Sequence, residues 1–433
     1  MLRVGNPDAL PRAFPRRPAR AWSALTTLTA TGLAAACVML SSSAASADQV
    51  RHQEWWLRAL HVTTAWDSSK GSGVTVAVLG TGVDRGQADL AGAVITGPDY
   101  THSGELPGGQ FWGTEGTAMA TLIGGRGHGP GHADGIIGVA PAARILSVRV
   151  TLEHNDPLLS DSAIAGGLPA AIAKGIRYAV RSGAGVIDLP LDPVTTPGSA
   201  GAGGSRAERA AIAYALRKHV VVVAPAGDIT PGSGTGPVNF PAAYPGVISV
   251  GAFDSGFNKA PFSSRQPYVT LTAAGDGVVA AAGRSGYSQV SSTSAASAVV
   301  AGIAALIRAQ FPGLTPAQVT RALTTSAGFR RAGGRASGSG SGTVDAQRAL
   351  LAAARIAEAV PSGTAPALAP PSQPAVKATG KSLSRTLATN GIIAGAAFAA
   401  MVLLILGIAL RQRRRARAAR LAPARQAAQP RRS

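Results

Sequence analysis

The chain has 433 residues, is rich in glycine and poor in aromatic residues, and carries a net charge of +20 with a single cysteine. Such a length allows one large domain with appended segments, and one cysteine excludes an intrachain disulfide framework or a thiolate metal cluster. Residues 1–20 hold five arginines against one aspartate, and residues 411–433 hold nine arginines and no acid. Because both groups flank apolar segments, they indicate membrane topology and argue against nucleic acid as a partner.

The first 47 residues have the three parts of a signal peptide. An arginine-containing start is followed by an apolar stretch over 22–40 and by Ala45-Ser46-Ala47 before Asp48. Cleavage after Ala47 is therefore expected. The apolar stretch also contains Cys37, so lipid attachment is an alternative, and an uncleaved anchor is another.

Residues 74–325 alternate short β-branched runs with helical periodicity. Strands are expected at 74–79, 143–150, 185–189 and 220–224, and helices at 116–124, 163–180 and 206–218. Apolar strands that do not alternate with polar residues predict a mostly parallel sheet covered by helices on both faces. We assign this α/β domain to residues 48–358.

The C-terminal region predicts a single-pass membrane anchor. Residues 359–390 are rich in proline, alanine and serine and form an expected linker. Residues 391–410 are uninterruptedly apolar, and about 20 such residues span a bilayer. By the positive-inside rule the arginine-rich tail 411–433 is cytoplasmic, which places the domain outside the cell membrane. The alternative for the apolar run is a buried core helix.

Several segments resemble, in order, the subtilase family of serine proteases, and within it the membrane-anchored mycosins of type VII secretion. The resemblance covers about 55–350 and rests on 53–57, Ala65-Trp66, 138–141, 240–250 and the expected helix 294–311. It implies a subtilisin-like three-layer fold and protein partners in a secretion machine.

The resemblance also assigns the positions that carry serine-protease chemistry. Ser294 lies at the nucleophile position within residues 291–296. Gly80 stands in place of the orienting aspartate, Glu115 in place of the histidine base, and Asp228 in place of the oxyanion-binding asparagine. The substrate-pairing motif Ser-Leu-Gly corresponds to Pro190, Leu191 and Asp192, where the proline removes a backbone donor.

A serine without a base or an orienting acid is not an activated nucleophile. The pattern therefore predicts a pseudoprotease that acts as a binding or scaffold module, without cofactor or metal. One alternative is an active serine endopeptidase, which could be acid-active because sedolisins use a glutamate and an aspartate where this chain has Glu115 and Asp228. Their second acid corresponds to Met119 here. Another alternative is a purely structural cell-envelope anchor. We expect Asp84 to be a loop acid, and His128 and His132 to lie on a surface loop.

Overall fold

The computed structural model describes residues 50–191, 204–328 and 338–359. All of them lie in the first of two units, Met1–Ala369, and the second unit is Pro370–Ser433. The expected signal peptide, the apolar span 391–410 and the arginine-rich tail fall outside the described residues, as does nearly all of the linker.

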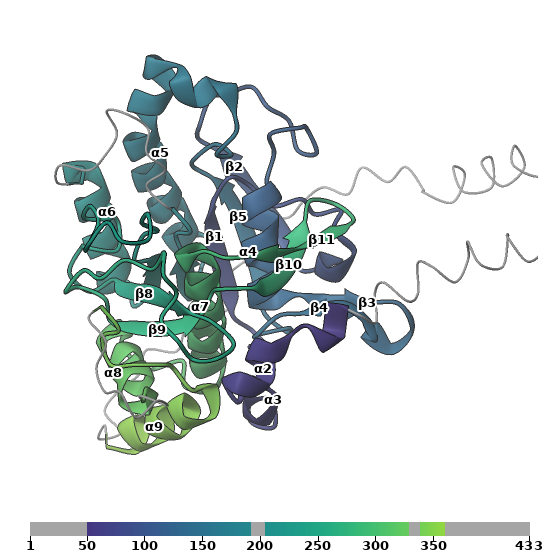
Figure 1. The fold of residues 1–433 in the computed structure, drawn as a ribbon, viewed down its shortest axis with the longest axis vertical. Helices are drawn as coiled ribbons and strands as arrows, with labels where there is room; N and C mark the ends of the chain where they lie inside the picture. The colour runs from purple at the N-terminus through teal and green to yellow at the C-terminus, as the bar shows by residue number, and fades with distance from the viewer. Residues whose placement is uncertain (1–49, 192–203, 329–337, 360–433) are drawn as a thin grey trace, which may run out of the picture. The chain divides into compact units, whose positions relative to one another are not determined.

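A seven-stranded sheet forms the centre of the domain (Figure 1), with strand order β2-β5-β1-β6-β7-β8-β9. All of its strand pairings are parallel. In spatial order the strands are β2 (Val94–Asp99), β5 (Arg144–Arg149), β1 (Thr75–Gly80), β6 (Val186–Asp188), β7 (Val221–Pro225), β8 (Ile248–Phe253) and β9 (Leu271–Ala274).

Helices cover both faces of this sheet because its strands direct apolar side chains to either side. Val76 and Val78 of β1 belong to the core that α4 (Thr114–Gly124) and α7 (Thr293–Gln310) complete. Ala77 and Leu79 belong to a second core with α5 (Ser162–Arg181) and α6 (Arg206–Arg217). The predicted three-layer α/β fold is confirmed, and the predicted elements within it end within two residues of the observed bounds.

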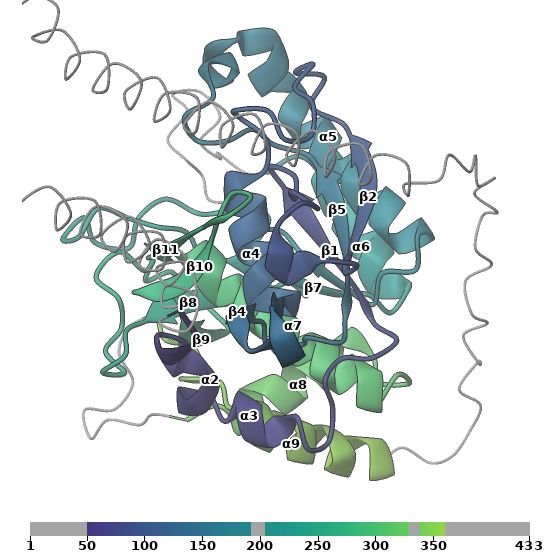
Figure 2. The same ribbon diagram turned by 90° about the vertical axis from the view of Figure 1, so that its right-hand side faces the viewer.

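The remaining elements pack around these layers. They are two antiparallel hairpins, β3 (Arg126–His128) with β4 (Asp134–Ile137) and β10 (Val278–Ala282) with β11 (Gly286–Val290), helices α2 (Trp55–Ala59), α3 (Val62–Ala65), α8 (Pro316–Ser326) and α9 (Ala346–Glu358), and the 3₁₀ turns Ala88–Leu90, Pro130–His132 and Pro157–Ser160. Figure 2 shows α3 beside α9, where the Ala346 amide donates to the Leu60 carbonyl over 2.9 Å. This bond ties the turn between α2 and α3 to the start of α9.

Helix α7 crosses the middle of the domain. Within the described part of the chain it is the one helix long and apolar enough to span a membrane, but 89% of its apolar window is buried inside the fold. It therefore serves as a core helix, and its first turn lies at the carboxyl edge of the parallel sheet. The carboxyl edge is where open α/β sheets place their functional residues.

Candidate active site

Ser294 is the second residue of α7. Ser292 is the N-cap of this helix, with its hydroxyl accepting the Ala295 amide over 3.0 Å, so Ser294 has no capping role. The Ser294 side chain is only 1% exposed. Among the described residues, its Oγ has no hydrogen-bond partner. A buried hydroxyl without a partner loses its hydration without compensation, which native structures usually avoid outside functional or formerly functional sites.

Asp228 follows β7 and is bonded directly to the start of α7. Its Oδ1 accepts the Thr293 amide over 2.8 Å, and the Gly227 amide donates to the Thr293 hydroxyl over 3.2 Å. Gly227 has a φ of 102°, a left-handed conformation suited to glycine. The helix N-terminus, which favours anions, thus already holds a carboxylate. A negative group in this position opposes a developing oxyanion.

Gly80 ends β1 on the face that carries α4 and α7. It pairs in register with Arg149 of β5. A Cβ atom added at Gly80 would lie 3.3 Å from Cγ of Pro190, which is a tight contact. The proline ring therefore fills the space next to the position where a carboxylate would orient a base.

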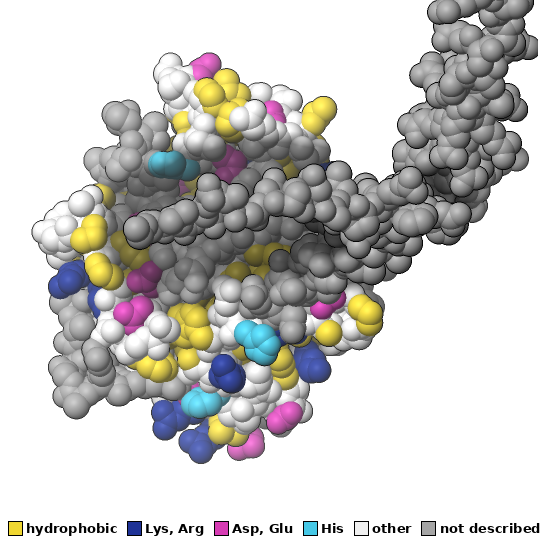
Figure 3. Space-filling view, turned by 45° about the vertical axis from the view of Figure 1, so that its right-hand side comes forward, with side chains coloured by type: hydrophobic (Ala, Val, Ile, Leu, Met, Phe, Trp, Pro, Cys, Tyr) yellow, Lys and Arg dark blue, Asp and Glu magenta, His cyan; other side chains and the backbone are white. Residues whose placement is uncertain are grey.

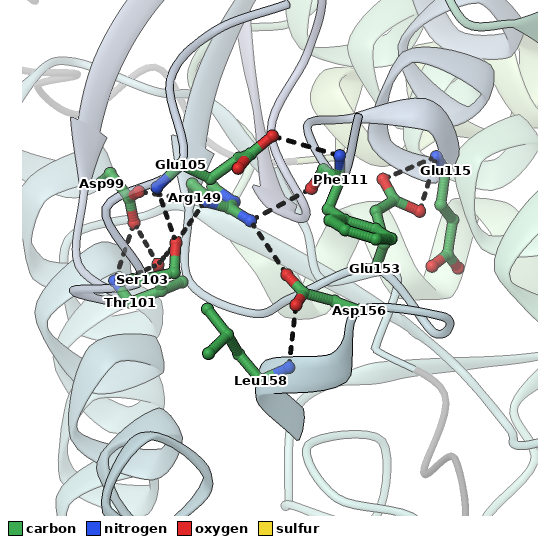
Figure 4. A network of polar contacts seen from close by, with 10 residues as sticks. All are labelled: Asp99, Thr101, Ser103, Glu105, Phe111, Glu115, Arg149, Glu153, Asp156 and Leu158. Carbon is green, nitrogen blue, oxygen red and sulfur yellow. Dashed lines mark hydrogen bonds and ion pairs between the residues drawn. The ribbon is translucent and has the colours of Figure 1, made fainter. Parts of the chain in front are cut away.

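Glu115 is the second residue of α4, whose first turn contacts the segment that follows β1. The Gly116 amide donates to the Thr81 hydroxyl over 3.0 Å, which ties the start of α4 to the end of β1. The structure thus brings these two predicted site segments together. The Glu115 amide lies 3.2 and 3.4 Å from the two carboxylate oxygens of Glu153, as Figure 4 shows. Glu153 is a buried acid that sequence reasoning missed, because no local motif surrounds it.

None of the seven histidines, all of them described, bonds to Ser294 Oγ. The expectation that His128 lies on a surface loop is wrong. His128 ends β3, and its Nδ1 lies 2.6 Å from the fully buried Asp89. His132 is exposed in a 3₁₀ turn. Asp84 lies in the loop after β1 and pairs with Arg284 at 3.1 Å.

The segment after β6 differs from a substrate-pairing strand. Leu191 donates its amide to the Leu189 carbonyl over 2.7 Å, and Pro190 between them has no N–H. Neither residue offers a backbone donor to an extended peptide. Asp192 lies outside the described residues.

Arg149, which pairs in register with Gly80, contacts several neighbouring loop residues, as Figure 4 shows. Its side chain is fully buried, with Nη1 3.2 Å from Asp99 Oδ2 and Nη2 3.8 Å from Asp156 Oδ2. Further donors reach Ser103 Oγ over 2.7 Å and the Phe111 carbonyl over 3.1 Å. Its guanidinium carbon lies 4.8 Å from the ring centre of Trp112. An arginine at the last position of a strand whose four central residues are buried was the available sequence signal for this cluster.

Among the described residues, neither the face seen in Figure 3 nor the metal-ligating side chains indicate a second site. On the face seen in Figure 3, basic and acidic side chains are scattered among apolar ones. Among the described residues, no group of three or more histidine, cysteine, aspartate or glutamate side chains could hold a metal ion.

The strand order and the serine at the start of the central helix define a subtilisin-like α/β protein. The sequence profile of the subtilase family matches residues 71–351, and the chain belongs to this family. It is 35% identical to thermitase of Thermoactinomyces vulgaris over 57% of this chain and 78% of thermitase. It is 33% identical to mycosin-1 of Mycobacterium tuberculosis over 68% of this chain and 72% of mycosin-1.

Solved structures give the same assignment. MycP1, described as a serine protease and an essential component of the type VII (ESX-1) secretion system, is 31% identical, with a TM-score of 0.56 over 69% of this chain and 88% of MycP1. The chain is thus a mycosin-like subtilase.

Proposed function

We propose that this chain is a catalytically inactive mycosin-like subtilase that acts as a binding or scaffold module in a type VII secretion system. The observation that carries the proposal is the Ser294 hydroxyl, which is buried and lacks a hydrogen-bond partner among the described residues. A serine attacks a carbonyl only when a neighbouring base takes its proton. In the described part of the chain no base is bonded to Ser294 Oγ.

Two of the other positions, Gly80 and Asp228, support the same proposal because the surrounding structure is fitted to their replacements. The ring of Pro190 fills the space beside Gly80, and the carboxylate of Asp228 caps α7. Loss of one oxyanion donor alone lowers the rate of a protease by about 10²–10³. Loss of a triad residue lowers the rate further. We infer that the three replacements, Gly80, Glu115 and Asp228, leave the fold intact but remove the groups that would activate Ser294.

The location follows from the terminal segments and from the relatives. We assign residues 1–47 to a signal peptide, 391–410 to a membrane span and 411–433 to a cytoplasmic tail, with the domain outside. MycP1 belongs to a type VII secretion system by its description. Proteins of such a machine are the partners that this assignment implies.

A gene replacement separates a scaffold from a protease. Deletion of the gene is expected to impair secretion through the type VII system of its host, and the Ser294→Ala chain is expected to restore secretion as fully as the wild type. The matched control is Ser291→Ala, which changes a neighbouring serine outside the nucleophile position. A Ser294→Ala chain that is present at wild-type level but fails to restore secretion contradicts the proposal.

One observation favours a second candidate, an acid-active serine endopeptidase. Glu153 places a second carboxylate at the start of α4, beside Glu115, where Met119 supplies none. A carboxyl group that carries a proton at acid pH can donate that proton to the leaving group. Hydrolysis of casein between about pH 3 and 5, lost in Ser294→Ala, would establish this activity. Equal rates for both chains would remove it.

A further inference from the structure

A buried acid lies directly beneath the first turns of α7. Asp188 ends β6 and is 0% exposed. Its Oδ1 lies 2.9 Å from the hydroxyl of Ser297, and the same hydroxyl lies 2.9 Å from the backbone carbonyl oxygen of Ser294. Within the described structure its other oxygen, Oδ2, has no hydrogen-bond partner.

The number of protons decides how these groups are bonded. The Ser297 hydroxyl carries one hydrogen and faces two acceptors, so it cannot satisfy both if Asp188 is ionised. A proton on Asp188 removes the conflict, because the acid then donates to Ser297 Oγ while Ser297 donates to the Ser294 carbonyl. An ionised carboxylate here would be buried with one hydrogen bond and no counter-charge, which is costly.

We propose that Asp188 is held as a neutral acid whose proton ties β6 to the first turn of α7, and that this tie weakens as the pH rises. The first turn of α7 carries Ser294 and is capped by Ser292 and Asp228. When the tie weakens, the first turn of α7 opens more readily, which changes how the segment around Ser294 is exposed to a partner protein. It goes beyond the proposed function and holds whether or not Ser294 is catalytic.

The surroundings of Asp188 agree with this proposal. Burial raises the pKa of Asp188 to about 8, against a smaller lowering by the Ser297 hydrogen bond. Its neighbours in register are Val78 on β1 and Val223 on β7, and no charged group from the described elements acts on it. An acid with a raised pKa gives up its proton when the turn opens to water. The free energy of opening therefore falls as the pH rises from about 4, the ordinary pKa of an aspartate, to the raised pKa of Asp188.

Amide hydrogen exchange of the full-length chain in detergent tests the proposal. Exchange rates of peptides covering 293–300 are compared at pH 6.5 and 9.5 after correction for intrinsic exchange. In the wild type, the raised pKa of Asp188 predicts that the protection factors of these peptides fall by up to about thirtyfold from pH 6.5 to pH 9.5. Peptides of α5 serve as the internal reference for global unfolding. In Asp188→Asn, whose amide also donates to Ser297 but does not titrate, the protection should be equal at both pH values.

A second variant keeps the test decisive if Asp188→Asn does not fold. Glu54 is another buried acid, and burial raises its pKa to about 8. It lies at the start of α2, where its Oε1 accepts the Ile137 amide of β4. Glu54→Gln should retain the loss of protection in 293–300. Equal protection of the wild type at both pH values overturns the proposal, as does a loss that persists in Asp188→Asn or vanishes in Glu54→Gln.

Discussion

Replacement of Asp228 tests whether its carboxylate supports α7. The Thr293 amide donates to Asp228 Oδ1 over 2.8 Å at the N-terminus of an 18-residue helix. A hydrogen bond to a charged group contributes about 1.5–3 kcal/mol, and an anion at a helix N-terminus adds up to about 2 kcal/mol in a partly buried setting. We expect Asp228→Ala to lower the free energy of unfolding by about 2 kcal/mol.

Asp228→Asn separates charge from hydrogen bonding. Its amide oxygen can still accept from Thr293, so the expected loss is smaller, about 1 kcal/mol. The assay is denaturant unfolding at pH 7 and low salt. Glu358→Gln, at an exposed position in α9, is the control and should change stability by less than about 0.5 kcal/mol. If Asp228→Ala is as stable as the wild type, or Asp228→Asn more stable, the carboxylate does not cap α7.

Three further substitutions test the buried charged residues Glu153, Arg149 and Glu54. Glu153→Ala removes the acceptor at the start of α4 and should lower stability by about 1 kcal/mol in denaturant unfolding; an unchanged midpoint would contradict that role. Arg149→Met leaves Asp99 and Asp156 without their buried partner and should cost about 3–5 kcal/mol, seen as a lower melting temperature. Burial raises the pKa of Glu54 to about 8, so the wild type should lose stability relative to Glu54→Gln as the pH rises from about 4.5 to 8; parallel stability curves would refute this.

The fold could be predicted well because its signals are local. The apolar runs at 74–79 and 220–224 are too long and too unbroken for one-sided strands, and they form β1 and β7 at the centre of the sheet. The meeting of the segments at Gly80 and Glu115 could be predicted from the family resemblance. The structure places them in contact through Thr81 and Gly116.

The interior of the site could not be predicted, because its contacts join residues distant in sequence. Glu153 is bonded to the amide of Glu115, 38 positions earlier, and no spacing rule connects an acid in one loop with a helix start in another. In the sequence, Gly80 and Pro190 are two unrelated departures from the family motifs. Only the structure shows that the ring of Pro190 occupies the space beside Gly80. His128 was misjudged because its partner, Asp89, lies 39 positions away.

The most direct measurement is labelling of the purified full-length chain by a fluorophosphonate, which reacts with activated serines. The probe is applied at pH 7.5 and at pH 4, with an active subtilase as positive control and Ser294→Ala as the matched variant. A hydroxyl that has no base to receive its hydrogen should stay unmodified at both pH values, giving equal background for the two chains. Covalent adduct on Ser294 at either pH, absent from Ser294→Ala, would show an activated nucleophile and contradict the assignment as a pseudoprotease.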